Sequence, residues 1–270
     1  MDHAQGMYLM YVDSDDYLCN PDILSIMYRK AEDTDADYME MASQRVMGRH
    51  IRIKRRTISP VQGLIARPEL FDTYYISFFG VNILSVTAWG KLYRMETVRN
   101  AGLRPSGVFM GEDLAFNIQL FPHLRRIYIL DVVGYAYRFG VMTNRYNPHL
   151  LPDLKVLYHL KKELIERYGY TRAADFIRIE LKNVFRSDIC QRIIHRTGSK
   201  EEICRQIREE LSDSVYQKLG EVTDHPDFLK EPIVGAMLAN DAPAVYDIAL
   251  RQVRNGRATR LIKRWVSGLL

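Results

Sequence analysis

The spacing of hydrophobic residues along the chain changes near residue 150. Before that point, short apolar runs typical of β-strands are interleaved with helical patterns, and after it apolar residues recur mostly at three- and four-residue intervals. Ser199 is an N-cap candidate, and Gly169 and Gly198 interrupt the helical pattern. The amphipathic helices predicted in this second part cover residues 150–169, 172–196 and 199–220. The pattern predicts an α/β domain over residues 1–145 and a helical domain over residues 146–270.

The N-terminal stretch has the order strand, acidic loop, helix. Met7 to Val12 is an unbroken apolar run between Gly6 and a group of acids, which predicts a strand buried on both faces. Asn20 and Pro21 provide an N-cap and a first helical position, so a helix is predicted over residues 21–33.

The remaining elements of the first half are less regular. Residues 37–58 alternate loosely around the basic stretch "GRHIRIKRR", which indicates a hairpin or a mobile edge. The stretch "PELFDTYYISFF" reads as a helix that turns into an aromatic loop. Further along, the pattern predicts a short strand and a helix within 85–98, a helix from Glu112, and strands at 126–130 and 134–138.

Composition narrows the class of protein. With 270 residues, 47% of them hydrophobic, the chain can bury a full core. Its three cysteines are far apart and lack CxxC spacing, which argues against a disulfide framework or a zinc site and favours a reducing, cytoplasmic compartment. The sequence shows neither a signal-peptide pattern nor an apolar run of about 18 residues. The net charge of +5 is modest, and we expect no nucleic-acid partner.

The C-terminal stretch "RQVRNGRATRLIKRWVSGLL" places basic residues among apolar ones. Two interpretations remain open. The stretch is either a solvated helix end or a peripheral contact with an anionic surface, such as the inner face of the membrane.

The acidic loop, with Asp13, Asp15 and Asp16 directly after the apolar run, is the main candidate for chemistry. Carboxylates this close together, at a strand end, can share one divalent cation through oxygen ligands. An EF-hand loop is excluded because its Gly and Glu positions are occupied here by Leu18 and Leu24.

A phosphatase site and a purely structural role are two other interpretations of the acidic loop. A phosphatase of the haloacid dehalogenase type also has an Asp-x-Asp pattern after an early strand, but Tyr17 stands where that family has Thr or Val. This phosphatase remains an alternative. Turns and caps alone would account for one acid, such as Asp16, but not for three.

Four motifs in order resemble the bacterial family 2 glycosyltransferases of the GT-A fold. They are "YLMYVDSDDYLCNPDIL" at 8–24, "WGKLYR" at 89–94, "GEDLAFN" at 111–117 and "YAYRFG" at 135–140. The resemblance covers roughly residues 1–140 and implies an α/β fold, a GT-A mixed sheet with flanking helices. It also implies that the chain lacks the N-terminal part of the nucleotide-binding domain. The helical C-terminal region carries none of these motifs.

The resemblance implies a metal-dependent, inverting transfer of sugar from a nucleotide-diphosphate sugar, expected to be a UDP-sugar. The expected acceptor is a saccharide or a lipid-linked molecule in cell-surface polysaccharide synthesis. Asp13 and Asp15 resemble the family's DXD motif and would hold Mn²⁺ or Mg²⁺, while Ser14 and Asp16 would support them.

A transfer with inversion also needs a carboxylate that takes the proton of the acceptor hydroxyl. Asp113 matches the family's catalytic base, with Glu112 beside it. The alternative is that both acids favour the dipole of a helix N-terminus.

The resemblance assigns donor and acceptor contacts to a second group of residues. Trp89, Gly90 and Lys91 correspond to a loop where an indole stacks on a sugar and an ammonium meets phosphate. Arg138 would reach the diphosphate. A core position for Trp89 and a surface ion pair for Arg138 remain the alternatives.

The expected lack of N-terminal strands has physical consequences. Met7 to Val12 would lie at a sheet edge, so we expect a second copy of the chain or its own segments to cover it. We also expect weak nucleotide-sugar binding and slow transfer. If the helical half dominates, the chain would instead be a non-catalytic interaction protein.

Overall fold

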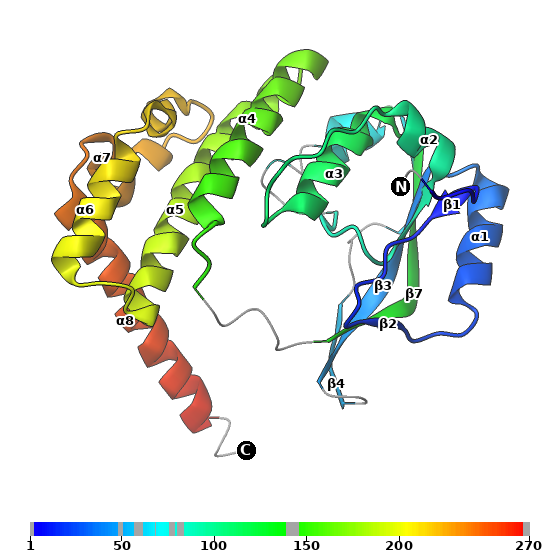
Figure 1. Ribbon diagram of the computed structural model, residues 1–270, viewed down its shortest axis with the longest axis horizontal. Helices are drawn as coiled ribbons and strands as arrows, with labels where there is room; N and C mark the ends of the chain where they lie inside the picture. Colours follow the sequence, from blue (N-terminus) through cyan, green and yellow to red (C-terminus); the bar gives the residue numbers. More distant parts are fainter. Residues whose placement is uncertain are drawn as a thin grey trace. The chain divides into compact units, whose positions relative to one another are not determined.

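The computed structural model of the chain describes residues 3–47, 51–56, 62–67, 69–75, 79, 84–138 and 146–266. The chain forms two compact units. The first comprises residues 1–144 and 163–170, and the second comprises residues 145–162 and 171–270. Figure 1 shows that the strands belong to the first unit, whereas the second is built from helices. Within the described ranges, no helix combines the length and hydropathy needed to cross a bilayer.

The first unit contains a mixed sheet with the strand order β1-β6-β3-β7-β2, in which β4 pairs with β3 and β5 with β7. Strands β3 and β7 are parallel, and the other pairs are antiparallel. The predicted α/β fold with a mixed sheet is therefore confirmed. The strands are β1 (Tyr8–Leu9), β2 (Tyr17–Leu18), β3 (Tyr38–Met47), β4 (Ile51–Arg56), β5 (Gly63–Ala66), β6 (Lys91–Arg94) and β7 (Arg126–Arg138).

The strand predicted over Met7 to Val12 is much shorter in the structure, and the prediction of burial on both faces was wrong. Only Tyr8 and Leu9 pair with β6, and Tyr11 adds an isolated parallel bridge to Trp89. Met7 is 59% exposed and Val12 is 46% exposed. Because β1 stands at the end of the strand order, only one neighbouring strand pairs with it.

The middle of the chain partly follows the sequence prediction. The hairpin expected within residues 37–58 is present as the antiparallel pair of β3 and β4. The two strands predicted at 126–130 and 134–138 are one continuous strand, β7. The pairing of β7 with β3 shifts register beside Leu130. The strand continues through this irregularity, so the predicted break between two strands does not occur.

The described part of the first unit includes the α-helices α1 (Ile23–Thr34), α2 (Met95–Asn100) and α3 (Glu112–Leu120). Helix α1 confirms the prediction for residues 21–33, because its buried residues Ile23, Met27 and Ala31 recur at four-residue intervals. They join a core cluster that includes Met41 and Tyr135 from the sheet. The stretch predicted to turn from helix into loop contains a short π-helix at Leu70–Tyr74.

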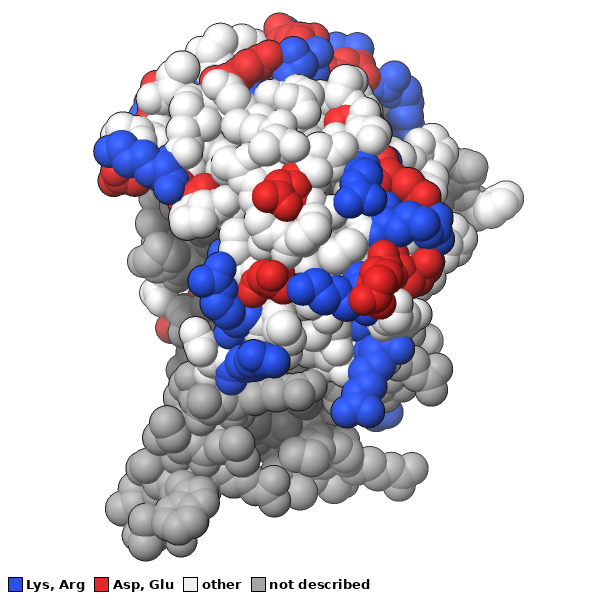
Figure 2. All heavy atoms as spheres, turned by 90° about the vertical axis from the view of Figure 1, so that its left-hand side faces the viewer, with Lys and Arg blue, Asp and Glu red and all other residues white. Residues whose placement is uncertain are grey.

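The second unit is built mainly on five helices: α4 (Leu150–Tyr168), α5 (Ala174–His195), α6 (Lys200–Leu211), α7 (Pro232–Leu238) and α8 (Ala242–Val266). The predicted cap is confirmed, since Ser199 accepts a hydrogen bond from the backbone N–H of Glu202. On the face shown in Figure 2, acidic and basic side chains are interspersed. Ion pairs such as Arg205 with Glu202 on α6 and the modest net charge agree with such mixing of charges.

Candidate functional site

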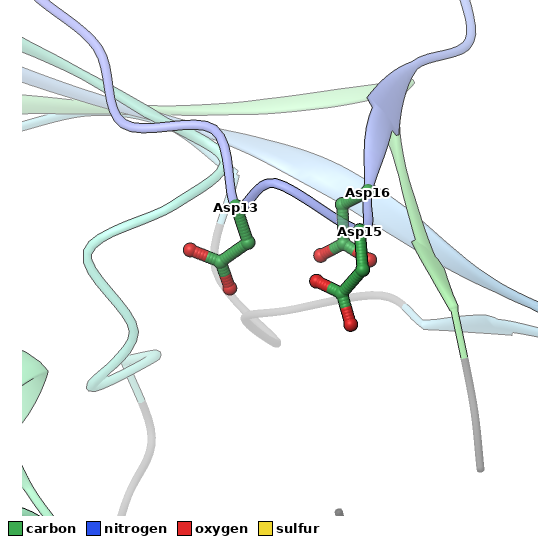
Figure 3. A group of neighbouring side chains, drawn as sticks. All are labelled: Asp13, Asp15 and Asp16. Carbon is green, nitrogen blue, oxygen red and sulfur yellow. The ribbon is translucent and has the colours of Figure 1, made fainter. Parts of the chain in front are cut away.

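The acidic loop forms a tight turn between β1 and β2. The backbone N–H of Asp16 donates to the carbonyl oxygen of Asp13 at 3.0 Å. One carboxylate oxygen from each of Asp13, Asp15 and Asp16 lies within 4.8 Å of the others, and Figure 3 shows the three groups on the same side of the loop. The turn thus gathers several negative charges in one small space.

Strand β7 holds this turn from the side. The Tyr135 hydroxyl accepts a hydrogen bond from the N–H of Asp13 at 3.1 Å and donates one to Oδ2 of Asp16 at 2.8 Å. The backbone N–H of Arg138 donates to Oδ1 of Asp16 at 2.8 Å. Both oxygens of Asp16 are therefore used by the protein. Among the described residues, the carboxylates of Asp13 and Asp15 accept no hydrogen bond, and both residues are exposed.

The pKa of the Asp13 carboxyl shows what surrounds it. Partial burial raises this pKa first, and the negative charges of Asp113, Asp16, Asp15 and Glu112 raise it further. Asp113 and Glu112 are thus close enough to repel Asp13, although they lie about a hundred residues away in the sequence. The structure brings the predicted base and the predicted metal ligands to the same region.

Burial also raises the pKa of Asp16, against the effect of its hydrogen bonds from Arg138 and Tyr135. Burial raises the pKa of Tyr135 as well, so its hydroxyl remains protonated and acts as the donor to Asp16. The turn therefore contains carboxylates whose ionised forms are disfavoured. A cation placed among them would relieve this repulsion.

Helix α3 is fixed to the same region by aromatic and amide contacts. The ring of Tyr11, two residues before Asp13, makes edge contacts with Tyr93 at 6.2 Å and Phe116 at 5.7 Å. Asp113 lies in the first turn of α3 and is partly exposed. The strand that leads into the acidic loop thus packs directly against the helix that carries Asp113.

The buried side chain of Asn117 connects α3 to the segment before β6. Its amide donates to the carbonyl oxygens of Val86, Thr87 and Asp113 at 3.0, 3.2 and 2.9 Å. Its oxygen accepts from the Tyr93 hydroxyl at 3.2 Å. Asn117 thereby fixes the helical turn on which Asp113 stands.

The structure buries Trp89 and Lys91, two of the residues expected to contact the donor or acceptor. The Trp89 ring is only 8% exposed and stacks on Tyr135 at 4.5 Å and on Tyr137 at 5.5 Å, which matches the core position kept as its alternative. Lys91 is fully buried, and its ammonium donates to the carbonyl and hydroxyl oxygens of Thr87.

The remaining candidates differ in exposure. Gly90 is buried, and its φ of +73° lies in the left-handed region that favours glycine, whereas a Cβ added there would meet the Tyr135 side chain only at an ordinary 4.0 Å. Arg138 is exposed, its guanidinium lies 5.4 Å from the centre of the Tyr17 ring, and its charge lowers the pKa of Asp16. Ser14 is exposed within the turn, and Glu112 is exposed beside Asp113.

Comparison with known proteins identifies the fold. No family model and no curated protein matches the sequence. The structure matches TarS residues 1–349 from S. aureus in complex with UDP-GlcNAc, with a TM-score of 0.62 and 15% identity over 94% of this chain and 70% of that one. It also matches the same protein in complex with UDP, with a TM-score of 0.61 and 17% identity over 94% and 69% of the two chains. The chain has the GT-A glycosyltransferase fold.

Within this GT-A fold, two residues of the site were missed by the sequence analysis. Tyr135 and Asn117 are the first residue of "YAYRFG" and the last of "GEDLAFN", so both motifs drew attention to them without indicating a role. Their roles depend on hydrogen bonds to segments up to 122 residues away, which the local pattern does not encode.

Proposed function

We propose that the chain is a glycosyltransferase that uses a nucleotide-diphosphate sugar, a UDP-sugar, as donor. The observation that carries the proposal is the packing of Tyr11, two residues before Asp13, on Phe116 of the helix that carries Asp113, with ring centres 5.7 Å apart. The negative charge of Asp113 also adds to the effect of burial in raising the pKa of Asp13. A group of carboxylates at a strand end and a further carboxylate on a nearby helix suit sugar transfer from a diphosphate. The fold match to TarS, whose structures contain UDP-GlcNAc and UDP, supports this choice of donor.

The donor set of the acidic turn fits a hard divalent cation. All candidate ligands are carboxylate oxygens, which suit Mn²⁺ or Mg²⁺, and the two exposed ones belong to Asp13 and Asp15. Asp16 serves as a support because its oxygens are engaged by Tyr135 and the Arg138 amide. When bound, such a cation supplies positive charge that stabilises the departing diphosphate.

In this proposal Asp113 accepts the proton of the acceptor hydroxyl, and transfer proceeds with inversion. Its helical turn is fixed through Asn117, so the carboxylate approaches the acidic turn from a rigid element. Arg138 provides a cation beside the turn for the diphosphate. The acceptor is proposed to be a saccharide or a lipid-linked molecule of cell-surface polysaccharide synthesis, and the protein is proposed to act in the cytoplasm.

Two variants separate the proposed roles. Asp15→Ala should abolish Mn²⁺-dependent binding of UDP in calorimetry, because it removes an exposed ligand. Asp113→Asn should retain that binding and lose transfer from the UDP-sugar by roughly 10²- to 10⁴-fold, the usual contribution of a general base. Asp33→Ala removes an exposed carboxylate on α1 and serves as the matched control.

Several results would count against the proposal. Unchanged UDP binding in Asp15→Ala would contradict the proposed cation site. Unchanged transfer in Asp113→Asn would contradict the role of Asp113 as the base. The GT-A fold already disfavours the haloacid dehalogenase-type phosphatase. Hydrolysis of phosphate esters through a phosphoaspartate at Asp13 would restore that alternative. If the wild-type chain bound no donor, the non-catalytic interaction protein would be the better interpretation.

A further inference from the structure

The acidic turn cannot hold its carboxylates together by its own contacts alone. Its backbone is closed by the hydrogen bond from Asp16 N–H to the Asp13 carbonyl, while three carboxylate oxygens within 4.8 Å of one another repel. A turn under such repulsion needs support from elsewhere in the fold.

That support converges on one side chain, Tyr135. Its hydroxyl contacts both ends of the turn, accepting from the Asp13 N–H and donating to the Asp16 carboxylate. Its ring is fully buried and stacks on Trp89 at 4.5 Å with an interplanar angle of 12°. In the sheet it lies opposite Leu18, just beyond the turn. The ring is thus immobilised, so its hydroxyl is a fixed point for the turn.

We infer that Tyr135 is a positioning residue, whose hydroxyl keeps the Asp13–Asp16 turn in the conformation that presents the carboxylates of Asp13 and Asp15 together. The inference rests on the proposed function only for what the turn binds. Tyr135 itself contacts no donor, acceptor or cation in this account. It acts through the backbone of Asp13 and the carboxylate of Asp16.

The neighbouring Tyr137 provides a matched control. It lies two residues along the same strand and stacks on the same indole at 5.5 Å. Among the described residues, its hydroxyl makes no hydrogen bond to the acidic turn. Tyr135→Phe and Tyr137→Phe therefore remove the same atom from similar rings, but only the first removes contacts with the turn.

The first measurement needs no ligand. Amide hydrogen exchange of the full chain, followed residue by residue, should show the Asp13 N–H exchanging roughly five- to tenfold faster in Tyr135→Phe than in the wild type, because its acceptor is lost. Tyr137→Phe should leave this rate unchanged. If Tyr135→Phe does not fold, Asp16→Ala tests the same link, since it releases the hydroxyl and should accelerate exchange at Asp13 in the same direction. Equal rates in the wild type and the variant that folds would overturn the inference.

The second measurement is titration with Mn²⁺ alone. Tyr135→Phe should bind it about 10- to 100-fold more weakly than the wild type, the usual effect of removing a group that orients a metal ligand, and Tyr137→Phe should bind it normally. If the wild type and Tyr135→Phe bind Mn²⁺ equally, the inference fails while the proposed function stands. If the wild type binds no Mn²⁺, the proposed cation site fails, and the exchange rates still decide whether Tyr135 positions the turn.

Discussion

Gly134 is the position where the packing of α1 on the sheet leaves no room for another atom. A Cβ atom added there would lie 2.3 Å from Cγ1 and 2.7 Å from Cδ1 of Ile23, and 2.5 Å from the sulfur of Met41. Favourable contacts between such atoms need about 3.5–4.0 Å. Ile23 and Met41 are both buried, and a β-branched side chain in a helix has little freedom to rotate. Gly134→Ala should therefore push α1 away from β7 by about 1 Å.

The expected cost of Gly134→Ala follows from this clash. Overpacking in a filled core lowers the free energy of unfolding by about 1–3 kcal/mol. Replacing glycine by alanine also restricts the unfolded chain, which raises that free energy by about 0.4–1 kcal/mol. We expect a net loss of about 1–2 kcal/mol in the free energy of unfolding. Gly235→Ala in α7 is the control, because its Cβ would meet nothing within 4 Å. That change lies in the second unit and should leave the unfolding transition of the unit that contains the sheet unchanged.

Urea unfolding followed by tryptophan fluorescence measures this difference. The chain has two tryptophans, and Trp89 is buried in the first unit, so a Trp265→Phe background reports on the unit that contains the sheet. Gly134 also accepts a hydrogen bond from the Cys19 N–H at 2.9 Å, so a displaced strand should disturb the acidic turn and weaken Mn²⁺ binding. A Gly134→Ala variant as stable as the wild type would refute the described contact between α1 and the sheet.

Three further predictions concern charge and surfaces. The pKa of Asp13 is higher in the folded state than its ordinary value of 3.8, so the folded state holds this proton more tightly than the unfolded state. The free energy of unfolding therefore falls as pH rises from about 3.8 through the raised pKa and Asp13 becomes ionised. Asp13→Asn should therefore raise the melting temperature at pH 7 without divalent cations, and Asp33→Asn should not; no difference between the two would contradict the repulsion. The apolar stretch from Met7 to Val12, which includes edge strand β1, should be covered by a second copy or by the chain's own segments. In the first case sedimentation should show a dimer that Val12→Lys shifts to monomer, and a wild-type monomer with this stretch exposed to solvent would argue against both. The basic C-terminal stretch should bind vesicles of anionic but not neutral lipid, and Arg257→Glu with Lys263→Glu should reduce that binding; equal binding of both vesicles would exclude this contact.

The sequence predicted those elements whose signals are local. Pro21 and Ser199 point to the beginnings of helices α1 and α6. Ser199 is the N-cap of α6 as predicted, whereas α1 begins at Ile23, two residues after Pro21. The sequence-based predictions were wrong where the burial or continuity of a strand depends on the strands that lie beside it in space. A continuous apolar run does not distinguish a central strand from an edge strand, so Met7 to Val12 was assigned too much burial. The residues near Gly134 resembled a break between strands, although pairing with β3 carries the strand through.

The same distinction applies to the site. Motif order brought Asp13 and Asp113 together because both stand at the ends of recognisable elements. The motif did not indicate whether the Lys91 side chain points into the core or into solvent. In the structure its ammonium is buried beside Thr87. Tyr135 went unnoticed because a tyrosine in an apolar strand reads as a core residue. Only the packed sheet shows that its hydroxyl reaches the acidic turn.

The organisation of β7 explains how a turn of repelling acids remains ordered. Over five consecutive residues, this strand supplies the Gly134 carbonyl to Cys19, the Tyr135 hydroxyl to both ends of the turn and the Arg138 N–H to Asp16. The strand is itself held between β3 and the short strand β2. The charge repulsion is thus balanced by contacts from a rigid element rather than within the loop, which leaves the carboxylates of Asp13 and Asp15 exposed. A variant that loosens β7 should therefore impair the turn even when every acidic residue is retained.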